Sequence, residues 1–304
     1  MKLLRDFFLI SQAMEEEDRY SKIIAGTMTW GSWGKQFSTA QMTDMIQYCF
    51  GMGLTTFDHA DIYGDYTNEA SFGTAFLQSG VPRDKVQLIT KCGIQFDAET
   101  RPNRVKHYEY GKAYIISSVE RSLKSLQTDY VDMLLLHRPS PLMHPGEIGE
   151  AIRTLQKAGK IRSFGVSNFS PSQIAVLETE LPVMGNQVEF SLTADEVLYD
   201  GTLDDCLAHK RMAMSWSPLG AFFREKTERT ARIRKAMEPM TEAYGASYDQ
   251  LLLAWIMKHP ANVYPVVGTA TKERLADALK AATITMDLQD WFILHEASRG
   301  QEVP

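Results

Sequence analysis

The chain has 304 residues, of which 44% are hydrophobic and 23% are charged, an ordinary composition for a globular protein. Its formal net charge of −6 argues against nucleic acid or an anionic membrane surface as the main partner. No apolar run approaches the roughly 20 residues needed to span a bilayer. The apolar N-terminal stretch is interrupted by Arg5 and Asp6 and so differs from a signal peptide. We therefore expect a cytoplasmic protein.

The cysteines and the absence of linkers bear on compartment and domain organisation. Cys49, Cys92 and Cys206 lack metal-ligand spacing and are expected to be buried thiols in a reducing compartment. No Pro/Gly/Ser-rich linker or repeat divides the chain. We expect an N-terminal extension over residues 1–21 and a single domain over residues 22–304.

Short apolar runs alternate along the chain with segments of helical period, which is typical of repeated β–α units and a parallel sheet. Strand-like runs cover residues 22–28, 55–58, 86–90, 131–136, 163–167, 186–190, 212–216 and 263–267. Eight strands, each followed by helix, predict a single-domain (β/α)8 TIM barrel. The competing fold is an open doubly wound sheet, but no G-x-G-x-x-G sequence follows an early strand.

Four ionisable residues follow the strand-like runs and carry the main chemical signal. Asp58 ends the second run, Tyr63 follows it closely, and Lys91 and His137 directly follow the third and fourth runs. A barrel collects its chemistry at the carboxyl ends of its strands, so we expect these side chains to meet there. An ammonium stabilises a phenolate, and an imidazole can orient a carbonyl, which predicts acid–base chemistry on a carbonyl oxygen. Any one of the four, taken alone, is more often a packing or solvated loop residue.

Two segments exceed the usual loop length, roughly residues 93–112 and 217–229. Long loops at the active rim of a barrel usually cover or shape a ligand site. Tyr108 and Tyr110 in the first loop either line a pocket or pack the loop down, and the sequence leaves both interpretations open.

Seven segments together resemble the aldo-keto reductases from about residue 22 to the C-terminus. They are TFDHADIYG, the strand ending in Lys91, LLLHRP, GVSNFSP, NQVEFS, SWSPLG and VVGTATKERL, in family order and at family-like spacing. The details TKCG, HRPSPLM and the C-terminal VP are similar to the bacterial YdhF-type oxidoreductase branch. The resemblance implies a (β/α)8 barrel enzyme that uses NADPH to reduce an aldehyde or ketone to an alcohol.

The resemblance also implies roles for particular residues. Tyr63 matches the general acid, Lys91 the partner that lowers its pKa, Asp58 the carboxylate paired with that lysine, and His137 the imidazole that orients the carbonyl. The residues matched to cofactor binding are Thr29, Trp30, Ser167, Asn168, Gln187, Trp216, Ser217, Leu219, Gly268, Thr269 and Arg274. Trp33 and Phe222 are expected to wall the substrate pocket, and the implied chemistry needs no metal.

The cofactor residues divide between the two ends of the dinucleotide. Ser167, Asn168 and Gln187 match residues that bind the nicotinamide carboxamide, and Trp216 matches the aromatic residue that stacks on its ring. Thr269 and Arg274 match the binders of the 2′-phosphate, and a guanidinium suits phosphate well. Gly268 stands where many relatives carry a lysine, for which Lys272 is a candidate electrostatic substitute. On balance NADPH is favoured over NADH.

Two other functions remain open at this point. One is an NADPH-binding regulatory subunit that resembles the potassium-channel β subunits and turns over little. The other is a phosphate-binding barrel isomerase or lyase without a nicotinamide. His137 favours carbonyl reduction, because relatives that reduce activated C=C bonds carry a glutamate at this position. The expected partner is a small-molecule carbonyl substrate, and we expect a monomer or small homo-oligomer.

Overall fold

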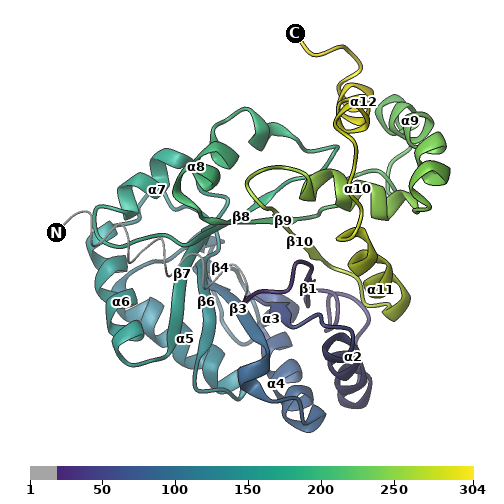
Figure 1. The fold of residues 1–304 in the computed structure, drawn as a ribbon. Helices are drawn as coiled ribbons and strands as arrows, with labels where there is room; N and C mark the ends of the chain where they lie inside the picture. Colours follow the sequence, from purple (N-terminus) through teal and green to yellow (C-terminus); the bar gives the residue numbers. More distant parts are fainter. Residues whose placement is uncertain (1–18) are drawn as a thin grey trace.

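The computed structural model describes residues 19–304, and its centre is a closed barrel of eight parallel strands. Their order around the barrel is β1-β10-β9-β8-β7-β6-β3-β2. The strands are β1 (Ile24–Gly26), β2 (Thr56–Asp58), β3 (Gln87–Cys92), β6 (Val131–Leu136), β7 (Ile161–Ser167), β8 (Gly185–Glu189), β9 (Met212–Trp216) and β10 (Tyr264–Val267). Each overlaps one predicted run, and the predicted (β/α)8 barrel is confirmed (Figure 1).

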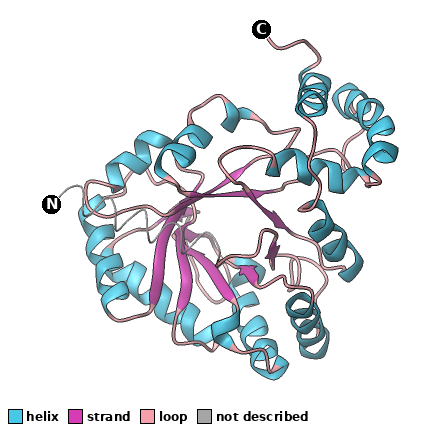
Figure 2. Cartoon of the chain, in the orientation of Figure 1, coloured by secondary structure: helices cyan, strands magenta, loops and turns pink. Residues whose placement is uncertain are grey.

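Helices surround the strands on the outside of the barrel (Figures 1 and 2). They are α2 (Thr39–Gly51), α3 (Tyr63–Tyr66), α4 (Asn68–Ser79), α5 (Lys112–Leu126), α6 (Pro145–Lys157), α7 (Pro171–Leu177), α8 (Thr202–His209), α9 (Glu228–Tyr244), α10 (Tyr248–Met257), α11 (Lys272–Ala281) and α12 (Leu288–Arg299), with 3-10 helices η1 (Arg83–Lys85) and η2 (Glu196–Leu198). In α5 the buried residues Ile115, Val119, Leu123 and Leu126 recur every three or four positions. This spacing places them on one face of the helix, which packs on β3.

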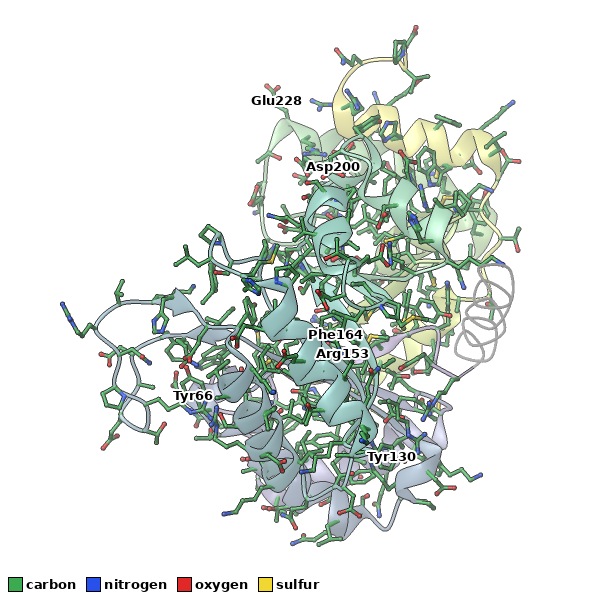
Figure 3. The ribbon with its side chains drawn as sticks, turned by 90° about the vertical axis from the view of Figure 1, so that its left-hand side faces the viewer. Tyr66, Tyr130, Arg153, Phe164, Asp200 and Glu228 are labelled. Atoms are coloured by element: carbon green, nitrogen blue, oxygen red, sulfur yellow. The ribbon has the colours of Figure 1, made fainter. Side chains whose placement is uncertain are left out.

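The long segment after β3 forms an antiparallel hairpin of β4 (Ile94–Gln95) and β5 (His107–Tyr108) at the carboxyl end of the barrel. Figure 3 shows it projecting from the molecule, with Tyr66 near its base. Tyr110 is buried, and a Cβ added at Gly93 would lie 2.0 Å from its ring, so this close approach requires glycine. Of the two interpretations left open, the structure gives Tyr110 the packing role, whereas Tyr108 is exposed.

The amino ends of the strands form the floor of the barrel. Tyr20 is buried there in a cluster that includes Ile24 and Met133. Arg19 lies 2.5 Å from the carboxylate of Asp132 on β6. The first 18 positions of the predicted 1–21 extension lie outside the described residues, and contacts with the barrel already begin at residue 19.

The cysteines are buried and free, as predicted. Burial raises the pKa of the Cys49 and Cys206 thiols to about 12, and that of Cys92 well above its ordinary value. All three therefore stay protonated near neutral pH and are poor nucleophiles. Within residues 19–304, none of the helices combines the length and apolar character that crossing a membrane requires.

Candidate active site

A buried ion pair lies at the mouth of the barrel, where β2 and β3 end. Lys91 Nζ lies 2.7 Å from each carboxylate oxygen of Asp58 and donates to the carbonyl of His59 at 2.9 Å. The hydroxyl of Tyr63 lies 3.3 Å from the same nitrogen. Asp58, Lys91 and Tyr63 thus form one hydrogen-bonded chain, and the structure brings together three of the four predicted catalytic residues.

The backbone turns sharply directly after Tyr63. Gly64, Asp65 and Tyr66 all have left-handed φ angles, of 59°, 55° and 66°. Such angles are uncommon outside glycine and cost roughly 1–3 kcal/mol each where a bulky residue adopts them. Strain of this kind concentrates at functional sites, and here it lies directly after Tyr63 in the chain.

The pKa values in this chain reflect burial and charge together. Burial raises the pKa of Tyr63, and the Lys91 ammonium opposes this only in part. The expectation that Lys91 lowers the phenol pKa therefore holds for its own contribution, but the net direction is upward. For Lys91, burial lowers the pKa, yet attraction to Asp58 and Tyr63 outweighs it and the net pKa is raised. The lysine remains charged and the tyrosine remains protonated at neutral pH.

His137 completes the predicted catalytic set. Its ring centroid lies 6.1 Å from that of Tyr63, with the two rings nearly perpendicular. Burial, and then the positive charges of Lys91, Arg138 and Lys106, lower the pKa of His137 well below its ordinary value. The imidazole is therefore neutral, and one of its nitrogens can donate a hydrogen bond to a substrate oxygen.

A chain of polar contacts follows the rim from β9 to β8. The indole of Trp216 donates to Asn168 Oδ1 at 2.9 Å, and Asn168 Nδ2 donates to Ser167 Oγ at 2.8 Å. The Ser167 hydroxyl in turn donates to the carbonyl of Gln187 at 2.8 Å. Asn168 has a left-handed φ of 62°, and the capping box of Ser170 starts α7 directly after this turn. These contacts bring together four of the predicted nicotinamide-end residues.

Gln187 connects this rim to the ion pair. Its side-chain Nε2 donates to Asp58 Oδ1 at 2.9 Å, so Asp58 accepts from both Gln187 and Lys91. The resemblance implies only a contact between Gln187 and the nicotinamide carboxamide, and it does not predict the contact with Asp58. The sequence does not indicate that contact because β2 and β8 are far apart in the chain.

After β1, the predicted nicotinamide-end residues Thr29 and Trp30 contact Gly268 and Thr269, which belong to the predicted adenosine end and precede α11. Thr29 Oγ1 donates to the carbonyl of Gly268 at 2.8 Å, and the Trp30 indole donates to that of Thr269 at 3.2 Å. Trp30 is fully buried in the core. Arg274 and Gly268 are both exposed.

Lys272 forms an ion pair and does not extend freely towards Gly268. Its ammonium lies 2.6 Å from the carboxylate of Asp44 on α2 and over the ring of Tyr48. The expected electrostatic substitution for the lysine missing at Gly268 is therefore weakened, because Asp44 already neutralises Lys272. In the SWSPLG loop, Ser217 and Leu219 are partly buried, and Ser217 has a left-handed φ of 51°.

The two predicted walls of the substrate pocket differ. Trp33 is 41% exposed, with its ring centroid 6.1 Å from that of Tyr63, and stands at the edge of the site. Phe222 is only 1% exposed and packs against Tyr248 of α10, whereas Phe223 is exposed. The loop after β9 turns Phe222 into the core, so the expectation that its ring lines an open pocket is wrong.

A second buried acidic pair lies behind the catalytic chain. Asp61 accepts from Ser118 of α5 at 3.0 Å, and Glu69 of α4 accepts from Thr90 at 2.6 Å. Burial and the charge of Glu69 raise the pKa of Asp61 to about 7. The backbone N–H of Asp61 donates to the carbonyl of Lys91, which fixes the end of β3. The sequence shows Asp61 within DHADIYG, but it gives no sign of the partners on α4 and α5.

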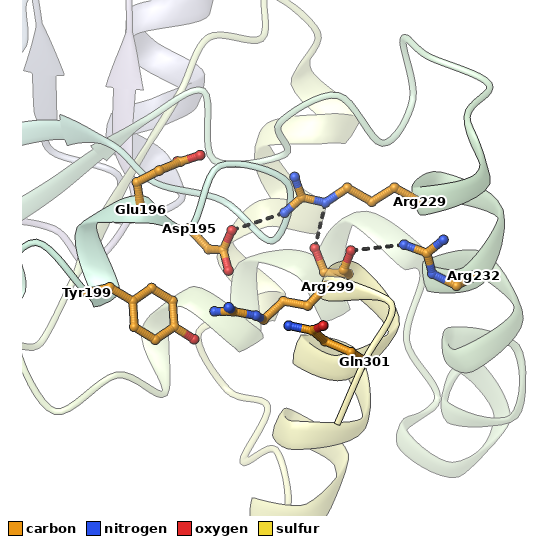
Figure 4. Close-up of a pocket in the computed structure, with 8 residues that line it drawn as sticks. Asp195, Glu196, Tyr199, Arg229, Arg232, Arg299 and Gln301 are labelled. Atoms are coloured by element: carbon orange, nitrogen blue, oxygen red, sulfur yellow. Dashed lines mark hydrogen bonds and ion pairs between the residues drawn. The ribbon is translucent and has the colours of Figure 1, made fainter. Parts of the chain in front are cut away.

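A separate hollow of about 520 Å³ lies beside the C-terminal helix α12 (Figure 4). It is lined by Asp195, Glu196, Tyr199, Arg229, Arg232, Ser298, Arg299 and Gln301. Arg229 donates to Ser298 Oγ and to Asp195, and Arg232 donates to the carbonyls of Ala297 and Ser298. These contacts fasten the end of α12 to α9, so we interpret the hollow as part of the docking of this helix.

Comparisons with known proteins agree with this geometry. Residues 22–299 match the profile of the Aldo/keto reductase family. YcsN of Bacillus subtilis, named an uncharacterized oxidoreductase, is 41% identical over 96% of this chain and 98% of its own length. The oxidoreductase YdhF of Escherichia coli is 37% identical over 94% of this chain and 96% of its own length. The resemblance seen in the sequence, including its YdhF-type branch, is confirmed.

Two further similarities concern a reaction and a cofactor. The 6-dehydroglucose reductase of Agrobacterium fabrum is 37% identical over 96% of this chain and 98% of its own length. The aldo/keto reductase of Klebsiella pneumoniae, solved in complex with NADP and acetate, superposes with a TM-score of 0.75 at 28% identity, covering 94% of this chain and 93% of that one.

Proposed function

Since the chain belongs to the aldo/keto reductase family and is an oxidoreductase, we propose that it reduces an aldehyde or ketone with NADPH, with Tyr63 as the proton donor. The observation that carries the proposal is the chain from Asp58 through Lys91 to the Tyr63 hydroxyl, facing a neutral His137. It supplies a proton donor, a counter-charge and an orienting hydrogen-bond donor around one point.

The residues at the mouth fit a nicotinamide cofactor. Trp216 presents a partly exposed indole beside Asn168 and Ser167, which together offer an aromatic face and amide and hydroxyl groups. The bound cofactor would supply the hydride that adds to the carbonyl carbon. Thr269 and the exposed guanidinium of Arg274 would hold the 2′-phosphate, which favours NADPH over NADH.

The protein's own residues manage the proton and the developing charge. As the carbonyl oxygen gains electron density, Tyr63 gives it the hydroxyl proton, and His137 holds the oxygen by a hydrogen bond. The phenolate that remains on Tyr63 is stabilised by the Lys91 ammonium. Asp58 and Gln187 keep that ammonium in place and balance its charge.

Cofactor titration followed by turnover tests this proposal. Quenching of tryptophan fluorescence is measured with NADPH and NADH, and NADPH oxidation is then followed with 4-nitrobenzaldehyde and D-glyceraldehyde. The second aldehyde is included because one relative is named for a sugar aldehyde. We expect tighter binding of NADPH than of NADH, and aldehyde-dependent oxidation.

Three results would contradict the proposal in different ways. Tight NADPH binding without turnover of any carbonyl would favour a regulatory subunit that only binds the cofactor. Equal affinity for both cofactors would remove the assigned role of Arg274 and Thr269. Failure to bind either dinucleotide would favour barrel chemistry without a nicotinamide.

A further inference from the structure

Arg138 stands beside the proposed catalytic centre, where its charge helps to lower the pKa of His137, and no ligand contact has so far been assigned to it. It directly follows His137 at the end of β6 and is partly exposed. The Tyr110 hydroxyl donates to the Arg138 carbonyl at 2.5 Å and accepts from the Arg138 N–H at 3.2 Å. Because Tyr110 is itself buried, the backbone of Arg138 is held firmly and only its side chain is free to engage a ligand.

The Arg138 side chain reaches across the mouth of the barrel. Its Cζ atom lies 5.4 Å from the ring centroid of Trp216, the last residue of β9. In the barrel order, β7 and β8 separate β6 from β9. The guanidinium therefore reaches from the end of β6 towards the end of β9 at the mouth of the barrel, and its charge acts on both Tyr63 and His137.

The charge of Arg138 is not neutralised within the site. Among residues 19–304, no carboxylate lies within 4.0 Å of its guanidinium nitrogens. The charges that act on His137 are those of Lys91, Arg138 and Lys106, and all three are positive. Asp58 balances Lys91, whereas the rim carboxylate of Asp65 accepts a hydrogen bond from Trp33. Two of the cations that act on His137, Arg138 and Lys106, thus have no carboxylate within 4.0 Å among the described residues.

We propose that Arg138 binds a carboxylate on the substrate, so that the preferred substrates are aldehydes or ketones that carry an anionic group. A guanidinium presents a planar pair of N–H donors that matches a carboxylate, and exposed Lys106 on the hairpin adds to the attraction. This inference rests on the proposed carbonyl reduction and adds to it the class of substrate.

The test compares an anionic aldehyde, 4-carboxybenzaldehyde, with its uncharged methyl ester, methyl 4-formylbenzoate, which adds one methyl group. We expect wild-type kcat/KM to be about tenfold higher for the carboxylate, the size of one charge-assisted hydrogen bond at a partly exposed site. The preference should reside in KM and shrink between 50 and 500 mM NaCl as the charges are screened. Arg138→Gln should abolish the preference while leaving kcat/KM for the ester within about twofold.

A matched control removes the same charge elsewhere. Arg153→Gln on α6, where Arg153 forms an exposed ion pair with Glu180, should keep the full preference for the carboxylate. Lys106→Gln should reduce the preference by a smaller factor than Arg138→Gln, because its charge lies on an exposed loop.

The outcomes separate this inference from the proposed function. Reduction of both aldehydes with equal kcat/KM would overturn the role of Arg138 and leave carbonyl reduction intact. Reduction of neither would instead count against the proposed function. If Arg138→Gln weakens NADPH binding several-fold with no change in substrate preference, Arg138 belongs to the cofactor site and the inference is wrong.

Discussion

The barrel holds a buried aspartate at each end, and the two are paired in different ways. At the mouth, Asp58 is balanced by one buried lysine, whose nitrogen also faces the hydroxyl of Tyr63. At the floor, Asp132 is surrounded by three arginines, with Arg19 at 2.5 Å, Arg83 at 2.8 Å and Arg162 at 3.6 Å.

The difference is the one expected between the proposed catalytic site and a cluster that stabilises the barrel. At the floor, Asp132 also accepts from the backbone of Leu88, and the guanidiniums of Arg83 and Arg162 lie over the ring of Tyr130. Asp132 and the three arginines therefore all have partners at the floor. At the mouth, the Tyr63 hydroxyl has a proton to give, and Nδ1 of His137 has no partner among the described residues. Barrel enzymes commonly place catalysis at the carboxyl ends of the strands and stability at the amino ends.

Removing the phenol hydroxyl at the mouth should have the largest effect. We expect Tyr63→Phe to lower kcat by roughly 10²–10⁴-fold, because the general acid is lost. NADPH affinity, measured by fluorescence quenching, should change by less than about twofold, because Tyr63 hydrogen-bonds Lys91 and no predicted cofactor-binding residue. A parallel loss of cofactor binding would show that Tyr63 serves the cofactor site.

Changing the floor aspartate should give the opposite result. Asp132→Asn should lower the free energy of unfolding in urea by about 2–3 kcal/mol, since a buried charge with three partners is lost while the arginines stay partly hydrated. The kcat of the folded fraction should equal that of the wild type. A selective loss of kcat at unchanged stability would contradict the division between mouth and floor.

The pH dependence of the free energy of unfolding tests the comparison between mouth and floor further. Near the mouth, a buried neutral histidine and a buried acid change this free energy in opposite directions as the pH rises. Burial lowers the pKa of His59 to about 3, so below its ordinary pKa the unfolded chain gains a proton that the native protein does not. The free energy of unfolding therefore decreases as the pH is lowered below the ordinary histidine pKa, by up to about 1.4 kcal/mol per pH unit for this group. Asp61, with its pKa raised to about 7, contributes stability at low pH that is lost as the pH rises through 7.

The variant Asp61→Asn removes one of these opposing contributions. Between pH 4.5 and 6.5 the free energy of unfolding should rise with pH more steeply than in the wild type, by about 1.4 kcal/mol per unit. Asp129→Asn, at an exposed position, is the control and should leave the slope unchanged. An unchanged slope in Asp61→Asn would mean that Asp61 is ionised in the native protein.

The smallest effect is expected at the far end of the cofactor cleft. Gly268 is exposed, and a Cβ added there would meet no atom within 4 Å, so a lysine fits. Gly268→Lys should raise the affinity for NADPH relative to NADH by roughly twofold to fivefold, as an exposed ion pair allows. Gly268→Ala controls for the loss of glycine. If both variants behave alike, the 2′-phosphate does not lie near this position.

The sequence alone predicted the barrel, because eight apolar runs separated by amphipathic helices specify the order and type of the elements. It also predicted that Asp58, Tyr63, Lys91 and His137 would meet, because strands of a parallel barrel end at the same rim. These features depend on the local hydrophobic pattern and on the order of the strands, and both can be predicted directly from the sequence.

Other features were decided only by tertiary packing. Gln187 reaches Asp58, Arg138 reaches Trp216, and Asp61 reaches Ser118 only once distant segments are adjacent in the closed barrel. Phe222 and Phe223 are the same residue type at neighbouring positions, yet one is buried and the other exposed. No periodic pattern distinguishes them, because the path of an irregular loop depends on what it packs against. The ionisation of the site is likewise tertiary, since burial and neighbouring charge, not residue type, set the pKa values of Tyr63 and His137.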